Sequence, residues 1–388
     1  MFLNRSLRHA FLAGAVLAGS CIASVASAAP PVVTVPGMPP VVDARNMYSE
    51  AGFNHFSPAV AGALQRIYVP NLRSDDVYVI DPKTFKVIDK FKVGHSPQHV
   101  VPSWDLKTLW VTNNAEHRTD GSLTPIDPKT GKPGTAIPVD GPYNMYFTPD
   151  GKEAIVVVEA KARLDFRDAH SMALKSSLPV PDCKGINHAD FSIDGTYAIF
   201  TCEFDGTIAK IDMVHHKVVG YMQLKKHGMP QDIRVSPDGK VFYVADMMAD
   251  GVYLIDGDNF TKIGFIPTGI GTHGMYPSRD GTKLYVANRG SNKVHGPRHG
   301  PGSVSVIDFA TRKVVANWPI PGGGSPDMGN VSADGKWLWL SGRFDDVVYA
   351  FNTTTGAVKI IKVGMEPHGL AVWPQPGRYS LGHTGIMR

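Results

Sequence analysis

Short segments in which apolar and polar residues alternate recur along the chain at a period of roughly 40–50 residues. The clearest copy spans residues 227–256 and reads HGMPQDIRVSPDGKVFYVADMMADGVYLID. It contains a Gly/Pro start, a strand, a Ser-Pro-Asp-Gly turn, a second strand, a polar loop and a third strand ending in Ile-Asp. Asp-Gly between two alternating apolar runs is a strong hairpin signal, because glycine adopts a positive φ without steric cost. The pattern predicts repeated antiparallel strands, four to a repeat.

The number of strands of each kind predicts how the repeats assemble. Seven second and seven third strands are recognisable, but only six first strands precede them; a seventh, PHGLAVW, stands at residues 367–373. The first repeat therefore lacks a first strand, and the last repeat is followed by a spare one. We predict an all-β, seven-bladed β-propeller over residues 64–373, closed by a C-terminal strand that joins the N-terminal blade and removes both open sheet edges. The irregular segment 161–182 leaves open whether the third blade is complete.

The second strands also carry a resemblance to a known family. LYVAN, VFYVAD and LWVTNN, together with the SPDG-type turns, are similar to the units of the YVTN-repeat β-propeller family, over about residues 64–373. The resemblance implies a bacterial protein that is secreted or periplasmic. Because the family's functions are diverse, it implies a fold and no particular activity.

The first 28 residues differ from the repeats and predict export. Arg5 and Arg8 precede a short apolar run at 11–25 and an Ala-Ser-Ala cleavage motif at 26–28. The run is too short for a membrane span, so we read a signal peptide cleaved near Ala28 and a periplasmic or secreted protein without a transmembrane segment. A lipoprotein signal ending at Cys21 is the alternative.

The remaining segments outside the repeats are short. Residues 29–63 are Pro-rich and then polar, and we read them as an extended lead-in. Residues 374–388 form a C-terminal tail carrying His383, which either packs over one face of the propeller or frays. We expect a monomer.

Composition excludes several function classes. The chain has 39 basic and 35 acidic residues without a basic stripe, so charge suggests no nucleic-acid partner. It contains no Cys-x-x-Cys-His, so covalent c-type haem is excluded, and no nucleophile elbow, phosphate loop or dinucleotide fingerprint. Cys183 and Cys202 remain after removal of the signal peptide, and either a disulfide or two free thiols is open.

The candidate chemistry lies where the first strands begin. In a propeller the first strands line the central channel, and their starts share a face with the loops between second and third strands. These starts carry four histidines and two aspartates: His99, His188, His273, His368, Asp232 and Asp327. Imidazole and carboxylate groups that converge on one axis suit copper or zinc. We predict a metal cage built from these side chains, with copper preferred.

Two questions about this cage stay open. The residues fall into two registers one residue apart, and adjacent residues of a regular strand point to opposite faces. Either the backbone is irregular there, or only one set faces the channel; the sets are His99, His188 and Asp232, and His273, Asp327 and His368. Histidines at these positions also fit a plain structural role, hydrogen-bonded to neighbouring blades.

Other side chains reach the same face. Glu159 and Glu203 end second strands where related repeats have asparagine, and we predict that they act as catalytic proton acceptors beside the metal. The loop with His295 and His299 is long enough to cover the channel mouth.

The leading hypothesis is therefore a metal-binding propeller with redox chemistry on a small molecule. It is an analogy of architecture to nitrous oxide reductase and thiocyanate dehydrogenase. The alternatives are a non-catalytic scaffold for a protein or other surface partner, and a site for a tetrapyrrole or quinone.

Overall fold

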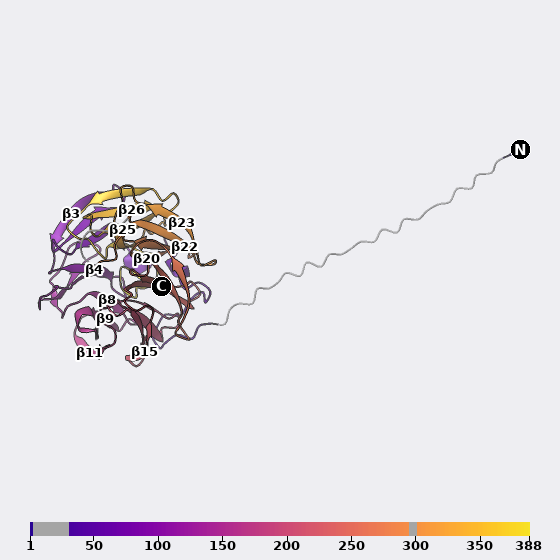
Figure 1. The fold of residues 1–388 in the computed structure, drawn as a ribbon. Coiled ribbons are helices and arrows are strands. Elements are labelled where there is room, and N and C mark those ends of the chain that lie inside the picture. The colour runs from indigo at the N-terminus through magenta and orange to yellow at the C-terminus, as the bar shows by residue number, and fades with distance from the viewer. Residues whose placement is uncertain (3–30, 295–300) are drawn as a thin grey trace. The chain divides into compact units, whose positions relative to one another are not determined.

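The computed structural model describes residues 1–2, 31–294 and 301–388. Most of the predicted signal peptide, the lipoprotein cysteine Cys21 and the loop histidines His295 and His299 lie outside the described residues. Residues 31–388 form one unit. Within its described part, seven four-stranded antiparallel sheets form the blades of a propeller (Figure 1).

The blades are numbered along the chain, and each is given from its innermost to its outermost strand. Blade 1 has β28 (Ala371–Trp373), β1 (Arg66–Asn71), β2 (Asp76–Asp81) and β3 (Lys86–Lys92); blade 2 has β4 (Pro97–Pro102), β5 (Leu109–Asn113), β6 (Ser122–Ile126) and β7 (Ile137–Pro138). Blade 3 has β8 (Asn144–Phe147), β9 (Glu153–Val158), β10 (Arg163–Asp168) and β11 (Leu174–Pro179); blade 4 has β12 (Ile186–Phe191), β13 (Tyr197–Cys202), β14 (Thr207–Asp212) and β15 (Lys217–Gln223). Blade 5 has β16 (Pro230–Val235), β17 (Val241–Asp246), β18 (Gly251–Asp256) and β19 (Thr261–Pro267); blade 6 has β20 (Thr272–Pro277), β21 (Lys283–Asn288), β22 (Ser303–Asp308) and β23 (Lys313–Pro319). Blade 7 has β24 (Pro326–Val331), β25 (Trp337–Gly342), β26 (Val347–Asn352) and β27 (Val358–Lys362), and short 3-10 helices occur at η1 (Ser49–Ala51), η2 (Pro58–Val60) and η3 (Glu159–Lys161).

The predicted closure is confirmed. Strand β28 pairs antiparallel with β1, with Ile67 opposite Val372 and Tyr68 opposite Ala371. The third blade is complete, because β10 and β11 pair along their length despite their irregular sequence. The structure therefore confirms the all-β, seven-bladed propeller that the number of strands predicted.

The turns between first and second strands explain why the repeats fold locally. In blade 5 the Ser236 hydroxyl donates to Asp238 Oδ1 (2.5 Å) and accepts the Val241 N–H (2.9 Å), while Gly239 takes a φ of +73°. The serine and aspartate side chains thus form hydrogen bonds within the turn. These bonds stabilise the turn where the ladder of hydrogen bonds between the two strands ends. The same Ser–Asp bond recurs at Ser103, Ser192, Ser278 and Ser332.

Burial falls from the axis outwards. Strands β16 and β17 are buried along their whole length, whereas most residues of β19 are exposed. Apolar clusters fill the space between neighbouring blades, and the cluster between blades 3 and 4 includes Cys183 and Cys202. These two cysteines form a disulfide, which settles the pairing that the sequence left open.

The lead-in, residues 31–63, follows the face that carries the turns between first and second strands. The Met47 N–H donates to the Pro237 carbonyl (2.7 Å) of blade 5, and the Asn54 N–H donates to the Ala333 carbonyl (2.9 Å) of blade 7. The lead-in therefore crosses several blades on the face opposite the first-strand starts.

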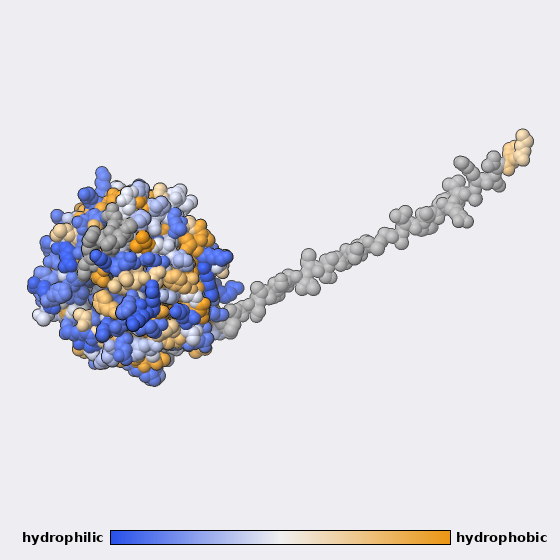
Figure 2. Space-filling view, viewed as in Figure 1, coloured by the Kyte–Doolittle hydropathy of each residue, from blue (hydrophilic) through white to orange (hydrophobic). Residues whose placement is uncertain are grey.

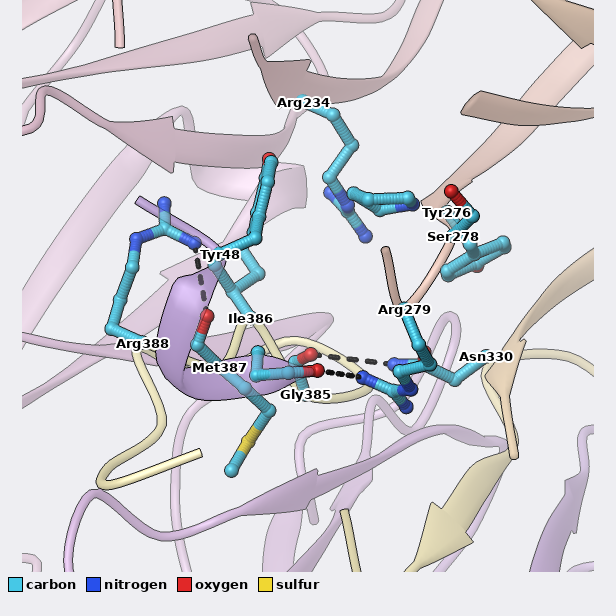
Figure 3. Close-up of a pocket in the computed structure, with 12 residues that line it drawn as sticks. Tyr48, Arg234, Tyr276, Ser278, Arg279, Asn330, Gly385, Ile386, Met387 and Arg388 are labelled. Atoms are coloured by element: carbon cyan, nitrogen blue, oxygen red, sulfur yellow. Dashed lines mark hydrogen bonds between the residues drawn. The ribbon is translucent and has the colours of Figure 1, made fainter. Parts of the chain in front are cut away.

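The C-terminal tail, residues 374–388, enters the channel from that same face. The His383 N–H donates to the Met145 carbonyl (2.9 Å) of blade 3, and the Thr384 hydroxyl donates to the Gly329 carbonyl (2.7 Å) of blade 7. Figure 3 shows the last residues beside Tyr48 of the lead-in, around a cavity of about 30 Å³. The tail thus forms a floor across the axis, rather than fraying.

The outer surface is mixed in polarity. Hydrophilic residues predominate on the face seen in Figure 2, with apolar residues scattered among them. No helix among the described residues is long and apolar enough to cross a membrane.

Candidate metal centre

An irregular backbone brings the first-strand starts to the axis. In β4, β12, β16, β20 and β24 the pairing with the second strand shifts register just after the strand begins. Second-strand hydroxyls take up the freed backbone groups: Thr112 Oγ1 accepts the His99 N–H (3.1 Å), and Thr201 Oγ1 accepts the His188 N–H (3.0 Å). A bulge of this kind re-aims side chains. It answers the register question, because side chains of both sets are buried at the axis.

Three histidines meet there. One ligand atom from each of His99, His188 and His383 lies within 4.8 Å of the other two, and all three side chains are fully buried. The ring centroids of His188 and His383 are 4.7 Å apart, and each is 5.3 Å from that of His99. Gly369 passes so close to the His99 ring that a Cβ there would overlap it.

The Nε2 atoms are the free ends of these rings. None of the three Nε2 atoms has a hydrogen-bond partner, although each is buried. His99 Nδ1 lies 3.0 Å from the Tyr143 carbonyl oxygen, so the ring donates there and leaves a lone pair on Nε2. Asn144 Nδ2 lies 3.1 Å from His188 Nδ1 and 3.0 Å from His383 Nδ1, and Asn144 Oδ1 accepts the Met145 N–H (2.8 Å), so the amide nitrogen donates to both rings. These two rings therefore carry their proton on Nε2, and metal binding there requires that proton to leave.

This donor set fits a transition-metal ion. Burial lowers the pKa of His99 to about 4, and burial, with His383 beside it, lowers that of His188 well below its usual value. The rings are therefore neutral near pH 7, which is the ligating form. Bonds of ~2.0–2.1 Å at tetrahedral angles need a nitrogen spacing of roughly 3.3–3.5 Å. The ligand atoms lie within 4.8 Å of one another, so the rings would have to approach by up to about 1.5 Å to reach that spacing.

A second group surrounds Asp327 and adjoins the first, because the ring centroid of His368 lies 4.8 Å from that of His99. Its carboxylate lies 2.6 Å from His368 Nδ1, 2.7 Å from Arg289 Nη2 and 2.9 Å from His273 Nδ1. Burial works to raise the pKa of Asp327, but Arg289 and the two histidines outweigh it and hold the pKa well below its usual range. Tyr143 lies 3.2 Å from His368 Nε2, so a chain of hydrogen bonds runs from Asp327 through His368 to Tyr143.

Asp232 stands apart from both groups. Its Oδ1 lies 2.6 Å from Arg234 Nη1, and its Oδ2 accepts the Met275 N–H (2.8 Å). The nearest approach to the histidines is 3.6 Å, between Oδ1 and His383 Nε2. The six predicted ligands thus converge on the axis but divide into a histidine pair, a cluster around Asp327 and a separate arginine-bound aspartate.

His383 is the residue that the repeat pattern missed as a candidate ligand. It comes from the tail, which has no repeat register to align. Its only local signal is the pair of flanking glycines, Gly382 and Gly385, whose φ values of +105° and +117° allow the chain to turn inside the channel. A Cβ at residue 382 would collide with the Met145 carbonyl.

A funnel opens above the cluster on the face of the first-strand starts. Its volume is about 280 Å³, and its wall includes Gln98, Tyr143, Glu159, Glu203, His273 and Arg343. The two predicted catalytic carboxyls therefore lie in one cavity. Burial, followed by the charge and hydrogen bond of Glu203, raises the pKa of Glu159 well above its usual value, which favours the protonated form of Glu159.

Comparisons with solved structures agree with this fold. The chain is similar to the dihydro-haem d1 dehydrogenase NirN, solved in complex with DHE, at 15% identity and a TM-score of 0.59, covering 80% of this chain and 75% of that one. It is similar to Kuenenia stuttgartiensis hydrazine synthase, at 20% identity and 0.56, covering 79% and 94%. A functionally unknown protein from Desulfotomaculum acetoxidans gives 15% identity and 0.62, covering 80% and 99%. At such identities the likeness shows the fold alone.

The sequence comparisons define the family. No curated protein sequence matches the chain. The family model described as YNCE-like beta-propeller matches residues 22–376, which include every blade. That match is consistent with the resemblance to YVTN repeats seen in the second strands. The chain belongs to the YNCE-like β-propeller family.

Proposed function

We propose that this protein is an exported, periplasmic β-propeller that binds a copper ion through His99, His188 and His383, beneath a funnel that admits a small molecule. The observation that carries the proposal is the set of three buried Nε2 atoms without a partner. A buried polar atom left unpaired costs free energy, so three at one point favour a ligand that binds all of them.

Copper is preferred for reasons of ligand chemistry. Neutral imidazoles bind copper, zinc, iron and nickel, and copper stands highest in affinity for nitrogen donors among these ions. Zinc fits the same three ligands and is the second candidate ion. The disulfide between Cys183 and Cys202 supports export, because disulfides persist in oxidising compartments.

The residues around the three histidines would orient the ligand rings and support them through hydrogen bonds. The Tyr143 carbonyl would accept the Nδ1–H of His99, as outer partners do in metal proteins, and the Asn144 amide would hold the Nδ1 sides of His188 and His383 by donating to them. His368 holds the Tyr143 hydroxyl toward the funnel side, with Asp327 behind it. In this proposal His273, His368 and Asp327 support the site as a hydrogen-bonded group rather than as ligands.

The proposed reaction class is redox chemistry on a small molecule. Copper, when bound, would supply a centre that exchanges single electrons. Glu159 and Glu203 would accept the proton that an oxidised substrate releases, because both carboxyls line the cavity that would admit it. The funnel wall would orient the substrate and limit its exposure to water.

Metal analysis of the exported protein tests the proposal. Protein purified from the periplasm without an affinity tag or chelator is analysed by mass spectrometry, then titrated with copper and with zinc. We expect about one equivalent of metal, lost in His188→Ala and in His383→Ala. His215→Ala is the matched control, since His215 is an exposed histidine bonded to Asp212 on the opposite face.

Two results would overturn the proposal. One is protein that stays metal-free after titration, which would favour the non-catalytic scaffold. The other is metal bound equally by the control and by both axis variants. Circular dichroism of each variant shows whether the propeller is intact.

A further inference from the structure

The carboxyl pair Glu159 and Glu203 in the funnel differs from the buried aspartates near the axis. Asp190, Asp232 and Asp327 each lie within 2.7 Å of an arginine nitrogen. Glu203 instead accepts hydrogen bonds from two neutral amides, Asn187 Nδ2 and Gln231 Nε2, both at 2.9 Å. Among the described residues, neither Glu203 nor Glu159 forms an ion pair. The pair therefore joins a buried carboxyl, Glu203, to a partly exposed one, Glu159, without a direct ion pair to either, an arrangement that favours binding of a cation.

The lysine and arginine side chains that line the same funnel already have acidic partners. Arg118 Nη2 lies 2.7 Å from Asp120 Oδ2, and Lys161 Nζ lies 2.6 Å from Asp140 Oδ2. Arg289 is bound to Asp327 and lies 2.5 Å from His273 Nε2. Arg343 Nη2 lies 3.1 Å from Glu366 Oε1. The polar groups of the funnel wall that remain available to a ligand are therefore hydrogen-bond acceptors rather than donors.

A second, independent observation points the same way. Gln98 lines the funnel and is 2% exposed, and its Oε1 has no hydrogen-bond partner. Its Nε2 lies 3.3 Å from Glu116 Oε1, which fixes the amide with the oxygen as the free end. A buried amide oxygen without a donor is able to accept a hydrogen bond from a ligand that carries N–H or O–H groups.

An aromatic side chain stands at the mouth. Phe204 directly follows Glu203, lines the funnel and is 55% exposed. An exposed phenyl ring beside an acidic centre offers an apolar surface for a carbon skeleton and a π face for a cation. Acceptors, negative charge and an aromatic wall are the combination that suits an organic ammonium ion.

We propose that the funnel binds a small primary amine in its ammonium form, with Glu159 and Glu203 receiving the charged group, Gln98 accepting one of its hydrogens and Phe204 packing on its carbon skeleton. The site is distinct from the histidine cluster, which supplies none of these groups. Amine binding therefore does not depend on whether a metal is bound.

The test uses three matched probes on metal-free wild-type protein. Benzylamine, benzyl alcohol and benzoate have similar shapes and differ in charge. Isothermal titration calorimetry is expected to detect benzylamine at sub-millimolar to millimolar concentration and to find at least ~10-fold weaker binding of the alcohol and of benzoate. Equal binding of the alcohol, or no benzylamine binding at 10-fold higher protein concentration, would overturn the proposal.

Variants assign the binding to the carboxyl pair. Glu159→Gln/Glu203→Gln keeps the side-chain shape and removes the charge, and it should weaken benzylamine at least ~10-fold. Asp140→Asn is the matched control, because Asp140 lines the same funnel but is paired with Lys161 Nζ (2.6 Å) and Arg163 Nη2 (2.9 Å). Unchanged affinity in the double variant would refute the assignment. All samples in this test are metal-free. A failure to bind benzylamine therefore does not bear on the proposal that the histidines bind copper, and a failure to bind copper does not bear on amine binding.

Discussion

Because its buried histidines are neutral, the folded protein should lose stability in acid. For His99, the size of this loss in the free energy of unfolding can be calculated. In the unfolded chain a histidine takes up a proton near its ordinary pKa of 6.5, whereas burial lowers the pKa of His99 to about 4 in the fold. Between these values the unfolded state binds more protons, so stability falls as the pH falls. The contribution is fully present above pH 6.5 and is lost progressively down to pH 4.

The size of the loss follows from the shift. One pKa unit corresponds to about 1.4 kcal/mol, so the His99 term at pH 4 amounts to about 3 kcal/mol. Burial also lowers the pKa values of His188, His368 and His383, so they act in the same direction. The total loss between pH 8 and pH 4 therefore exceeds the His99 term alone.

Urea unfolding of the metal-free protein at pH 8 and pH 4 measures this loss. His99→Gln carries no titrating group at position 99, so its stability should fall by about 3 kcal/mol less than that of the wild type over the same interval. His215→Gln, with an exposed side chain, should behave as the wild type does. If His99→Gln loses as much stability as the wild type, His99 is not a neutral buried group and the reasoning fails.

Three further substitutions probe the site and the fold. Asn144→Asp places a carboxylate against two ligand-ring Nδ1 atoms, which leaves their Nε2 lone pairs free, and should tighten copper binding ~10-fold in a chelator competition. Gly369→Ala drives a methyl group into the His99 ring and should cost about 1–3 kcal/mol in urea unfolding and release the metal seen by mass spectrometry. Cys183→Ala/Cys202→Ala removes a cross-link between residues 19 apart and should lower the free energy of unfolding by about 3 kcal/mol, whereas an unchanged urea midpoint would show that the bond does not constrain the unfolded chain.

The fold could be predicted because the sequence of each repeat determines its own turns and strands through short-range interactions. The Ser-Pro-Asp-Gly turns fix each hairpin through bonds within a few residues, such as the one between Ser236 and Asp238. Closure could be predicted because it needed only a count of strands. The third blade was left open because its strands RLDFRD and LKSSLP lack the usual apolar alternation, and pairing with neighbours overrides that local weakness.

The site was predicted less completely, for two physical reasons. Whether His99 and His368 face the same axis depends on a bulge held by a threonine on the second strand, and side-chain alternation assumes regular strands. The position of His383 depends on the path of the tail. That path is set by hydrogen bonds to residues far away in the sequence, such as the bond from the His383 N–H to the Met145 carbonyl. Neither interaction leaves a periodic trace in the sequence.

A seven-fold repeat provides seven equivalent positions around the axis, and function requires that they become different. Blades 2 and 4 present His99 and His188, while blade 3 between them presents Asn144, which binds the His188 ring. Blades 6, 7 and 1 present two histidines around one aspartate. The tail breaks the remaining symmetry, because it adds a single histidine, His383. A three-nitrogen site therefore forms where His383 of the tail joins His99 and His188, which the first strands alone place on two blades separated by a third.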